Sequence, residues 1–468
     1  MKRFLWLGFV LFLYVICSGC GDTFRPIIIP NPPTFPDPRA AHTVLAINDN
    51  GTFVPGSAMV VDVSGDTDMS IANVGLAPVH AVQQSASQVL VVNHSVTTCT
   101  PIPCSDSITK LTFNSVIISG TTTISLPPNS APNFVATTES SQAYVLMPSY
   151  VDPATNVVVP SVGVVNTSAN SLGATIPVGN NPVAMAETPN TQKLYVANQG
   201  DNTVSAFNTI YLSPRPLDLN GFSPFSAPLW VIARSDSQRV YVLNGNNNNA
   251  FLSTIDTTST AGPDSVIGTI DSSVIPPHAA YMLYDGHLNR LYIPGDSQLT
   301  MLDVSQSIPQ VLTGGPITIP TVPLSSRGTA DPCSSTATAT LNTVAVAALP
   351  DGSRAYVGSY YEDAKDNICP QVTVIDVASN TIKSLIAVPG FPAYDALCST
   401  TISSPRVRFR LTMAAGGDSS RAYLASCDGG NVNIIDTSGD TYIMNLSAPA
   451  GSRLNNPPQN PVFLIAGP

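Results

Sequence analysis

The sequence predicts an all-β protein, because its composition and its hydropathy pattern both favour strands and turns. Only 10% of the 468 residues are charged, and the chain is rich in Val, Thr, Ser, Asn, Pro and Gly. These residue types disfavour long helices and suit strands and turns. Short apolar runs alternate with turn sequences such as Pro-Asp-Gly and Ser-Asp-Ser, which is typical of antiparallel hairpins.

One unit recurs along the chain and predicts the architecture. An apolar strand after a proline is followed by a polar turn, a second strand with Tyr or Leu, a loop, and a third strand that ends in Asp, Asn or Thr. The second-strand markers are Leu90, Tyr144, Tyr195, Tyr241, Tyr292, Tyr356 and Tyr423. The third-strand markers are Asp62, Thr112, Asn166, Asn208, Asp256, Asp303, Asp376 and Asp436. Their spacing is close to the roughly 40 to 50 residues of a β-propeller blade.

The markers also have a predicted role in packing. One four-stranded sheet cannot bury both of its faces, so successive sheets are expected to stack around an axis and to bury one another. The tyrosines are then expected to pack between sheets. The Asp and Asn side chains are expected to cap the turns that follow the third strands.

The two ends of the repeat region are predicted to complete one blade together. Residues 461–465 resemble an inner first strand with nothing after it, while residues 43–47 and 59–63 resemble second and third strands with no first strand before them. We therefore expect an all-β propeller of eight four-stranded blades with joint N- and C-terminal blade closure. Seven blades are the alternative, if the segment around Thr112 or Asn166 is a loop.

Three segments carry a family resemblance: KLYVANQGDNTVSAFNT (193–209), QVTVIDVASNTI (371–382) and NVNIIDTSGDT (431–441). They resemble the YVTN family of β-propeller repeats, found in prokaryotic surface and exported proteins. The resemblance covers roughly residues 41 to 466, and the Tyr-Val-Ala-Asn core at 195–198 is its most specific piece. It implies a non-enzymatic surface module that recognises a protein or a glycan.

The first forty residues predict export and lipid anchoring. Lys2 and Arg3 precede an apolar run from Phe4 to Ile16, which is too short for a stable transmembrane helix and reads as a signal peptide over 1–19. Cys20 follows Ser-Gly as in a lipobox, so we expect its acylation. Because Cys17 stands where leucine is usual, ordinary cleavage to a free periplasmic product is the alternative.

The predicted domain order continues with a proline-rich tether over residues 20–40 and a propeller over 41–468. Residues 25–39 hold six prolines, a density that favours extended polyproline II. The predicted location is the bacterial cell envelope, lipid-anchored on the extracytoplasmic side. A net charge of −11 without a basic cluster disfavours nucleic acid and anionic lipid as partners, so membrane contact is expected through the anchor only.

Besides the acylated Cys20, six cysteines remain after the predicted processing, an even number that favours three disulfides in an exported chain. They are Cys99, Cys104, Cys333, Cys369, Cys398 and Cys427. Links between blades and loops between second and third strands lie on one face of a propeller, which we call the link face. Cys333 and Cys398 are expected in links, Cys369 and Cys427 in the second-to-third loops of the blades that follow, and Cys99 and Cys104 together in one such loop. This placement predicts the pairs 333 with 369, 398 with 427, and 99 with 104. Zinc is the rival interpretation, but no Cys-x-x-Cys pair supports it.

A ligand, if one binds, is expected at the mouth of the channel on the link face. His80, Trp230 and His278 follow prolines at the starts of first strands. Histidine can bind metal or transfer protons, and tryptophan can stack on a sugar. The alternative is that both histidines are ordinary rim residues and Trp230 belongs to the core.

The sequence contains no nucleophile elbow, His-Glu-x-x-His, Walker loop or EF-hand loop. Glu362, Asp363 and Asp366 are acidic enough for calcium, but their spacing fits no known loop, so a solvated insertion is favoured. No catalytic residue, metal or cofactor is predicted. We expect a binding module for protein or glycan; the alternative is a propeller-type lactone or sugar-acid hydrolase with its site at the channel mouth.

Overall fold

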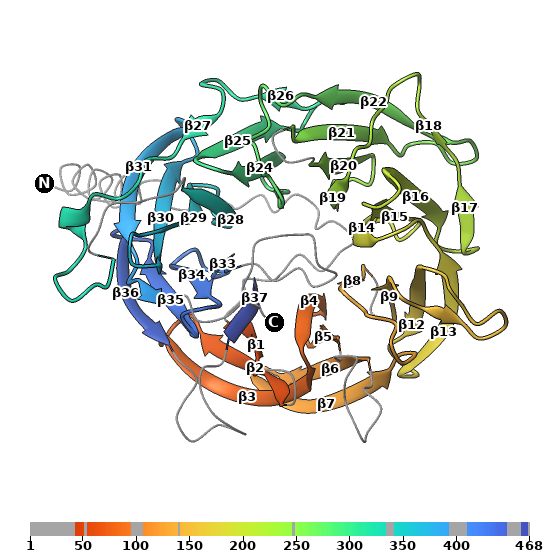
Figure 1. Cartoon of the computed structure of the whole chain (residues 1–468), viewed down its shortest axis with the longest axis horizontal. Helices are drawn as coiled ribbons and strands as arrows, with labels where there is room; N and C mark the ends of the chain where they lie inside the picture. Colours follow the sequence, from red (N-terminus) through yellow and green to blue (C-terminus); the bar gives the residue numbers. More distant parts are fainter. Residues whose placement is uncertain are drawn as a thin grey trace, which may run out of the picture. The chain divides into compact units, whose positions relative to one another are not determined.

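Eight antiparallel sheets surround a common axis in the part of the chain that the structure describes (Figure 1). The structure is a computed structural model, and it describes residues 43–50, 54–94, 106–138, 141–245, 249–333, 341–392, 410–446 and 460–466. All of them belong to one unit, Thr34–Pro468. The prediction of eight blades is thereby confirmed. The predicted signal peptide, Cys20 and the tether lie outside the described residues.

The first four blades each have four strands, ordered from the axis outward. Blade 1 contains β37 (Asn460–Ala466), β1 (Thr43–Asp49), β2 (Pro55–Asp62) and β3 (Thr67–Leu76). Blade 2 contains β4 (Pro78–Ser85), β5 (Gln88–Asn93), β6 (Ser107–Asn114) and β7 (Ile117–Ser125). Blade 3 contains β8 (Phe134–Ala136), β9 (Gln142–Met147), β12 (Ser161–Asn166) and β13 (Ser171–Pro177). Blade 4 contains β14 (Pro182–Glu187), β15 (Lys193–Asn198), β16 (Thr203–Asn208) and β17 (Ser213–Arg215).

The other four blades follow the same order. Blade 5 contains β19 (Pro228–Ala233), β20 (Arg239–Asn244), β21 (Phe251–Asp256) and β22 (Asp264–Ile270). Blade 6 contains β23 (Leu283–Asp285), β24 (Arg290–Gly295), β25 (Gln298–Asp303), β26 (Gln310–Val311) and β27 (Ile317–Thr318). Blade 7 contains β28 (Asn342–Ala348), β29 (Arg354–Glu362), β30 (Asn367–Asp376) and β31 (Thr381–Ala387). Blade 8 contains β33 (Leu411–Ala415), β34 (Arg421–Ser426), β35 (Asn431–Asp436) and β36 (Thr441–Leu446).

A few short elements depart from the repeat. A hairpin, β10 (Val151–Asp152) with β11 (Val157–Val158), is inserted between the second and third strands of blade 3. β18 (Leu217–Asp218) pairs in parallel with β22, and β32 (Phe391–Pro392) pairs with β30. A single 3-10 turn, η1 (Leu324–Ser326), precedes blade 7. Within the described ranges, no helix has the length and apolar character needed to cross a bilayer.

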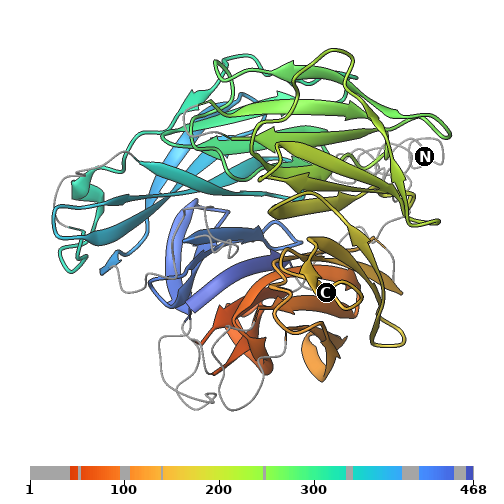
Figure 2. The ribbon, with the colours of Figure 1, turned by 45° about the vertical axis from the view of Figure 1, so that its right-hand side comes forward.

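Blade 1 joins the two ends of the domain, as predicted. β37 pairs antiparallel with β1, with Phe463 opposite Ile47 and Ile465 opposite Leu45. Figure 1 shows β37 in dark blue beside the orange-red β1, and Figure 2 shows the stacked blades from an oblique direction. Backbone hydrogen bonds between the first and last described strands therefore close the ring.

The marker residues have the predicted roles. All six tyrosines and Leu90 lie in second strands, and each is at most 1% exposed. Seven third-strand markers accept a backbone N–H from two or three residues later and so cap their turns: Asp62, Asn166, Asn208, Asp256, Asp303, Asp376 and Asp436. Thr112 differs, because β6 continues for two residues beyond it and no turn begins there.

A basic residue two positions before the tyrosine connects neighbouring blades, a feature that was not predicted from the sequence. In blades 4 to 8 this residue is Lys193, Arg239, Arg290, Arg354 and Arg421. Each side chain donates to the turn after the third strand of the following blade. The last of these contacts joins Arg421 of blade 8 to Asp66 of blade 1 at 3.0 Å, so it spans the closure of the ring.

Two of these cations contact a buried carboxylate that several side chains share. The fully buried Asp264 carboxylate lies 2.7 Å from Lys193 Nζ and 2.9 Å from Arg215 Nε, and it accepts a hydrogen bond from Tyr195 Oη at 2.6 Å. Burial, with the nearby Asp264 charge, raises the pKa of Tyr195, which therefore remains a hydrogen-bond donor. In blade 8 the carboxylate of Asp440 occupies a comparable position.

Replacing Asp264 tests how much these clusters stabilise the ring. Asp264→Asn leaves two buried cations without a carboxylate, so we expect a loss of about 3 to 5 kcal/mol in the free energy of unfolding. Asp440→Asn is the matched control, because Lys383, one of its partners, is 40% exposed and water can replace the carboxylate. Urea unfolding at pH 7 measures both losses. Equal losses would contradict the role assigned to the buried Asp264.

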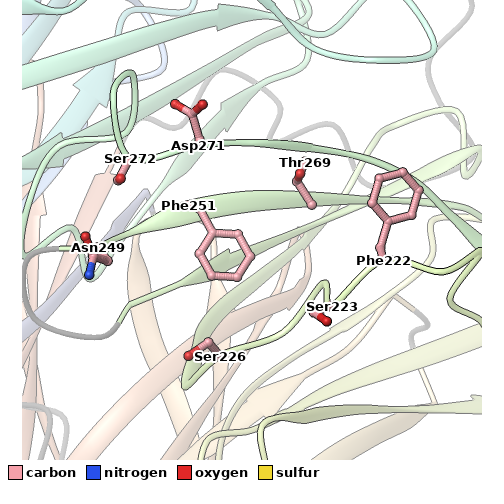
Figure 3. A pocket seen from close by; sticks show the side chains of 8 residues that line it. All are labelled: Phe222, Ser223, Ser226, Asn249, Phe251, Thr269, Asp271 and Ser272. Atoms are coloured by element: carbon pink, nitrogen blue, oxygen red, sulfur yellow. The ribbon is translucent and has the colours of Figure 1, made fainter.

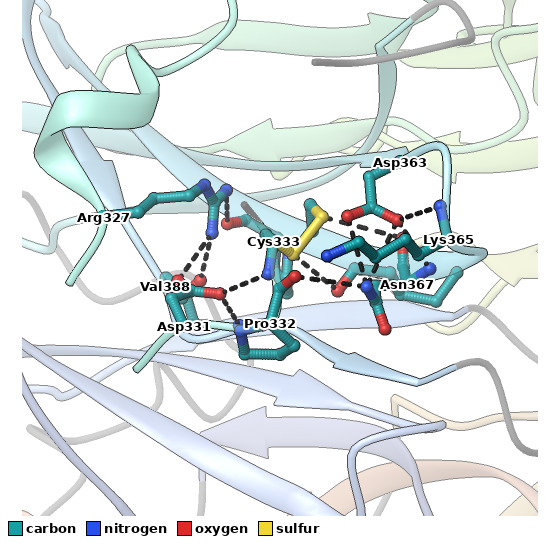
Figure 4. The surroundings of a disulfide bond; sticks show 12 residues. Arg327, Asp331, Pro332, Cys333, Asp363, Lys365, Asn367 and Val388 are labelled. Atoms are coloured by element: carbon teal, nitrogen blue, oxygen red, sulfur yellow. Dashed lines mark hydrogen bonds and ion pairs between the residues drawn. A yellow bond between two sulfur atoms is a disulfide. The ribbon is translucent and has the colours of Figure 1, made fainter. Parts of the chain in front are cut away.

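The predicted disulfide between Cys333 and Cys369 is present, with Cα atoms 5.7 Å apart (Figure 4). Cys369 was expected in a loop but lies in β30, because the β29–β30 hairpin extends beyond it to the pair Glu362 and Ile368. Cys427 lies in the turn after β34, as expected, and is also disulfide-bonded. Cys99, Cys104 and Cys398 lie outside the described residues, so the other two pairs stay predictions.

The segment that carries Cys333 is also held by a buried arginine (Figure 4). The Arg327 guanidinium donates to the carbonyl oxygens of Val388 and Pro370, both at 2.9 Å, and lies 3.1 Å from Asp331 Oδ2. Asp331 Oδ1 in turn accepts a hydrogen bond from the backbone N–H of Cys333 at 2.9 Å. The disulfide and Arg327 thus fix this link between blades 6 and 7 against β30.

Candidate functional site

The candidate site lies on the link face, where the chain passes from one blade to the next and from second to third strands. His80 and Trp230 hold equivalent positions in the first strands of blades 2 and 5. His80 lies opposite Val92 and Trp230 opposite Leu243, and each partner stands two residues after the second-strand marker of its blade. Phe134 has the same position in blade 3. The equivalent residues of blades 4, 7 and 8 are small: Ala184, Ala345 and Thr412.

Side chains from blades 1, 2, 3 and 5 and from the link before β23 form one aromatic cluster near the axis. The His80 ring stacks on Phe134 with ring centroids 3.9 Å apart, and Phe463 of blade 1 lies 4.7 Å from His80. Phe134 contacts Trp230 edge to face at 5.6 Å, and Trp230 contacts Tyr281 at 5.1 Å. Blades 3 and 5 are not neighbours, so Phe134 and Trp230 meet across blade 4. These five residues are called the axial aromatic cluster.

His80 is a packed ring within this cluster. It is 9% exposed, and burial lowers its pKa to about 3, so the imidazole is neutral at neutral pH. Its Nδ1 accepts a hydrogen bond from the backbone N–H of Val135 at 3.4 Å. Trp230 is likewise 9% exposed. The structure therefore brings two of the three predicted ligand residues into one cluster and leaves little of either accessible.

His278 lies apart from the axial aromatic cluster. Its side chain is 55% exposed, and Nδ1 lies 3.0 and 3.1 Å from the two carboxylate oxygens of Asp296. His278 belongs to the link between blades 5 and 6, and Asp296 to the turn between β24 and β25. The pair is therefore a rim contact on the link face.

Two of the three acidic residues of the β29–β30 hairpin have side-chain partners, and the predicted solvated insertion is wrong for Asp363, which is 1% exposed. Glu362 Oε1 lies 2.8 Å from Arg410 of the next blade. Asp363 is buried and caps the turn, because its Oδ1 accepts the backbone N–H groups of Lys365 and Asn367. Asp366 stands in the turn with φ of +59°. Across the described residues, no three His, Cys, Asp or Glu side chains gather in a way that could hold a metal ion.

A pocket of about 390 Å³ opens on the link face of blade 5 (Figure 3). Its lining comes from the link before β19, the loop before β21 and the end of β22 with the link after it. We call it the blade 5 pocket. Its lining residues are Phe222, Ser223, Ser226, Asn249, Phe251, Thr269, Asp271 and Ser272. This site was not predicted from the sequence, where its only signal is an aromatic residue within the polar link Gly-Phe-Ser-Pro.

Internal contacts hold the wall of the blade 5 pocket in place. Phe222 N–H donates to the carbonyl of Leu219 at 2.8 Å, and Ser226 N–H donates to Asn244 Oδ1 at 3.2 Å. The hydroxyl of Ser253 donates to the carbonyl of Pro224. On the opposite rim, hydrogen bonds from the hydroxyl and N–H of Ser273 lower the pKa of Asp271, which is therefore a carboxylate at neutral pH.

The fold defines the class of the protein as an eight-bladed β-propeller, and solved structures agree with it. AztD from Citrobacter koseri matches with a TM-score of 0.56 and 11% identity, covering 90% of this chain and 97% of that one. The dihydro-heme d1 dehydrogenase NirN, in complex with DHE, matches with a TM-score of 0.56 and 12% identity, covering 90% and 74%. At such identities the likeness shows the fold alone. No family model matches the chain, and no curated protein matches it by sequence.

The burial of His80 predicts a pH dependence of stability. The unfolded imidazole titrates near 6.5, whereas the folded one titrates near 3, so between these values the unfolded chain binds more protons. Acidification therefore lowers the free energy of unfolding by about 1.4 kcal/mol per pH unit below 6.5. In His80→Phe, urea unfolding should show a loss between pH 7 and pH 5 that is about 2 kcal/mol smaller than in the wild type.

Trp230→Leu is the control for this prediction. It removes a ring of the same axial aromatic cluster that packs on Phe134 and Tyr281 and leaves the ring stacked on His80 in place. The variant should therefore lower stability at both pH values and keep the wild-type pH dependence. A wild-type pH dependence in His80→Phe would show that His80 is accessible to protons in the folded state.

Proposed function

We propose that this chain is an extracytoplasmic, lipid-anchored β-propeller that binds a protein or a glycan at the cell envelope through its link face. The observation that carries the proposal is the blade 5 pocket, where Phe222 remains 40% exposed beside hydroxyl, amide and carboxylate groups. Exposed aromatic side chains beside polar groups are typical of binding surfaces.

The first residues of the chain support the extracytoplasmic location. An apolar run after Lys2 and Arg3 and the Ser-Gly-Cys sequence at 18–20 are features of an exported lipoprotein. A disulfide between Cys333 and Cys369 fits an oxidising compartment, because cytosolic thiols are kept reduced. The YVTN resemblance of residues 193–209 supports the same assignment.

A binding role is favoured over hydrolysis by the residues at the centre of the ring. Acid–base catalysis needs titratable groups within hydrogen-bond reach of the reacting atoms. The equivalent first-strand positions of seven blades hold three aromatic residues (Phe463, Phe134 and Trp230), one neutral imidazole (His80) and three small residues (Ala184, Ala345 and Thr412). Aromatic packing thus occupies the place where the hydrolase alternative expects its acid–base groups.

Acylation at Cys20 is the first test of the proposal. Cys20→Ser should abolish incorporation of labelled palmitate and release the protein from the membrane fraction, because the acyl chains supply the membrane affinity. Cys17→Ser is the control: this residue belongs to the predicted signal peptide, so the variant should remain labelled. Palmitate incorporation into Cys20→Ser would contradict the proposed anchor.

Site-specific cross-linking in intact cells tests the binding face. A photo-reactive amino acid in place of Ser272, on the link face, should cross-link to one defined envelope protein or glycan. The same replacement at Tyr211, which is 77% exposed in the turn between β16 and β17 on the opposite face, is the control and should give no such product. Mass spectrometry identifies the adduct. Equal cross-linking from both faces, or from neither, would contradict binding through the link face.

A further inference from the structure

We propose that the blade 5 pocket binds a neutral carbohydrate, with the rings of Phe222 and Phe251 packing against the apolar face of a sugar and the surrounding polar groups binding its hydroxyls. This inference rests on the proposed function, because it assigns the ligand class to the same link face. It also identifies the part of the link face that makes the contact.

The lining chemistry matches the two-sided character of a sugar ring. A pyranose has a face of C–H bonds, which packs on aromatic rings, and an edge of hydroxyls, which needs both donors and acceptors. Phe222 and Phe251 supply the rings, and Figure 3 shows polar side chains around them. The hydroxyl-binding groups are those of Ser223, Ser226, Asn249, Thr269, Asp271 and Ser272.

The charge of the pocket narrows the ligand class. Asp271 is a carboxylate at neutral pH, and none of the lining residues is Lys or Arg. An acidic sugar or a phosphorylated ligand would meet this carboxylate without a cation to balance it. Asp271 and Asn249 instead offer acceptors and donors for neighbouring hydroxyls of a neutral sugar. The volume of about 390 Å³ lies within the roughly 300–1,000 Å³ of small-ligand sites, which suits a short saccharide.

The packing of the link before β19 shows that Phe222 is not part of the core. This link has two phenylalanines three positions apart. Phe225 packs against the large core cluster that contains Trp230 and Val231, and so anchors the link. Phe222 is left 40% exposed beside the pocket, while the hydrogen bonds of Phe222, Ser226 and Pro224 described above keep the backbone in place. Because the backbone of the link is already held in place, a ligand that packs on Phe222 does not have to order this segment.

Titration calorimetry with defined saccharides tests the inference. The full-length protein in detergent is screened on an array of neutral and acidic glycans, and the strongest neutral mono- or disaccharide is then titrated into the wild type and the variants. Phe222→Ala and Phe251→Ala should each weaken binding at least tenfold, and Asp271→Asn should weaken it less. Tyr211→Ala removes an exposed aromatic from the opposite face and should leave the affinity unchanged. Circular dichroism of each variant confirms the folded state.

The outcomes separate this inference from the proposed function. If the wild type binds no neutral saccharide, or if both phenylalanine variants keep the wild-type affinity while folded, the blade 5 pocket is not a carbohydrate site. Cross-linking from Ser272 to one envelope protein would then leave the binding function standing with a protein as its ligand. If cross-linking from Ser272 also yields no defined product, the proposed function fails as well.

Discussion

The pairing of β37 with β1 is the constraint on which the rest of the ring depends. Each sheet has two apolar faces, and each face is covered by the neighbouring blade. An open stack of eight sheets would leave one face of the first and one of the last exposed to water. Because β37 completes the sheet that β1 begins, blade 1 buries residues of both chain ends, including Leu45 and Leu464, and both terminal faces find a neighbour.

Polar contacts between neighbouring blades also close the ring, at its periphery. From blade 4 onward, the basic residue before each tyrosine reaches the turn of the following blade, and Arg421 reaches Asp66 across 355 residues of sequence. Packing between sheets is tolerant of small rotations, whereas a hydrogen bond to a specific carbonyl or carboxylate is directional. The apolar core allows neighbouring blades a range of angles, and these directional contacts select one of them. Where the carboxylate is buried, as for Asp264, the contact also couples the fourth strand of a blade to its neighbour.

The repeat was predictable from sequence because its markers have local causes. A buried Tyr in a second strand and a carboxylate or amide that caps the next turn are fixed by strand periodicity and turn chemistry. The count of third-strand markers therefore predicted eight blades, and the strand patterns of the two chain ends predicted the closure. Contacts between blades have no such local signal. Lys193 and its equivalents in blades 5 to 7 stand at a fixed place in the repeat, but their partners lie 64 to 87 residues further on. The extension of the hairpin past Cys369 was likewise decided by pairing with Tyr361.

The candidate site shows that the role of an aromatic residue in this chain depends on its structural surroundings, which the sequence alone does not give. Trp230 is a candidate ligand residue by sequence because it follows a proline at the start of a first strand, yet the same position is aromatic in blades 1 and 3, where Phe463 and Phe134 join it in the axial aromatic cluster. Because aromatic residues recur at this position in several blades, we assign Trp230 to the packing around the axis. Phe222 belongs to a link with an extra strand, β18, whose pairing with β22 is the one parallel pairing among the described strands. The propeller fold accounts for the features that all blades share, whereas a ligand site on a single blade depends on residues that the other blades lack.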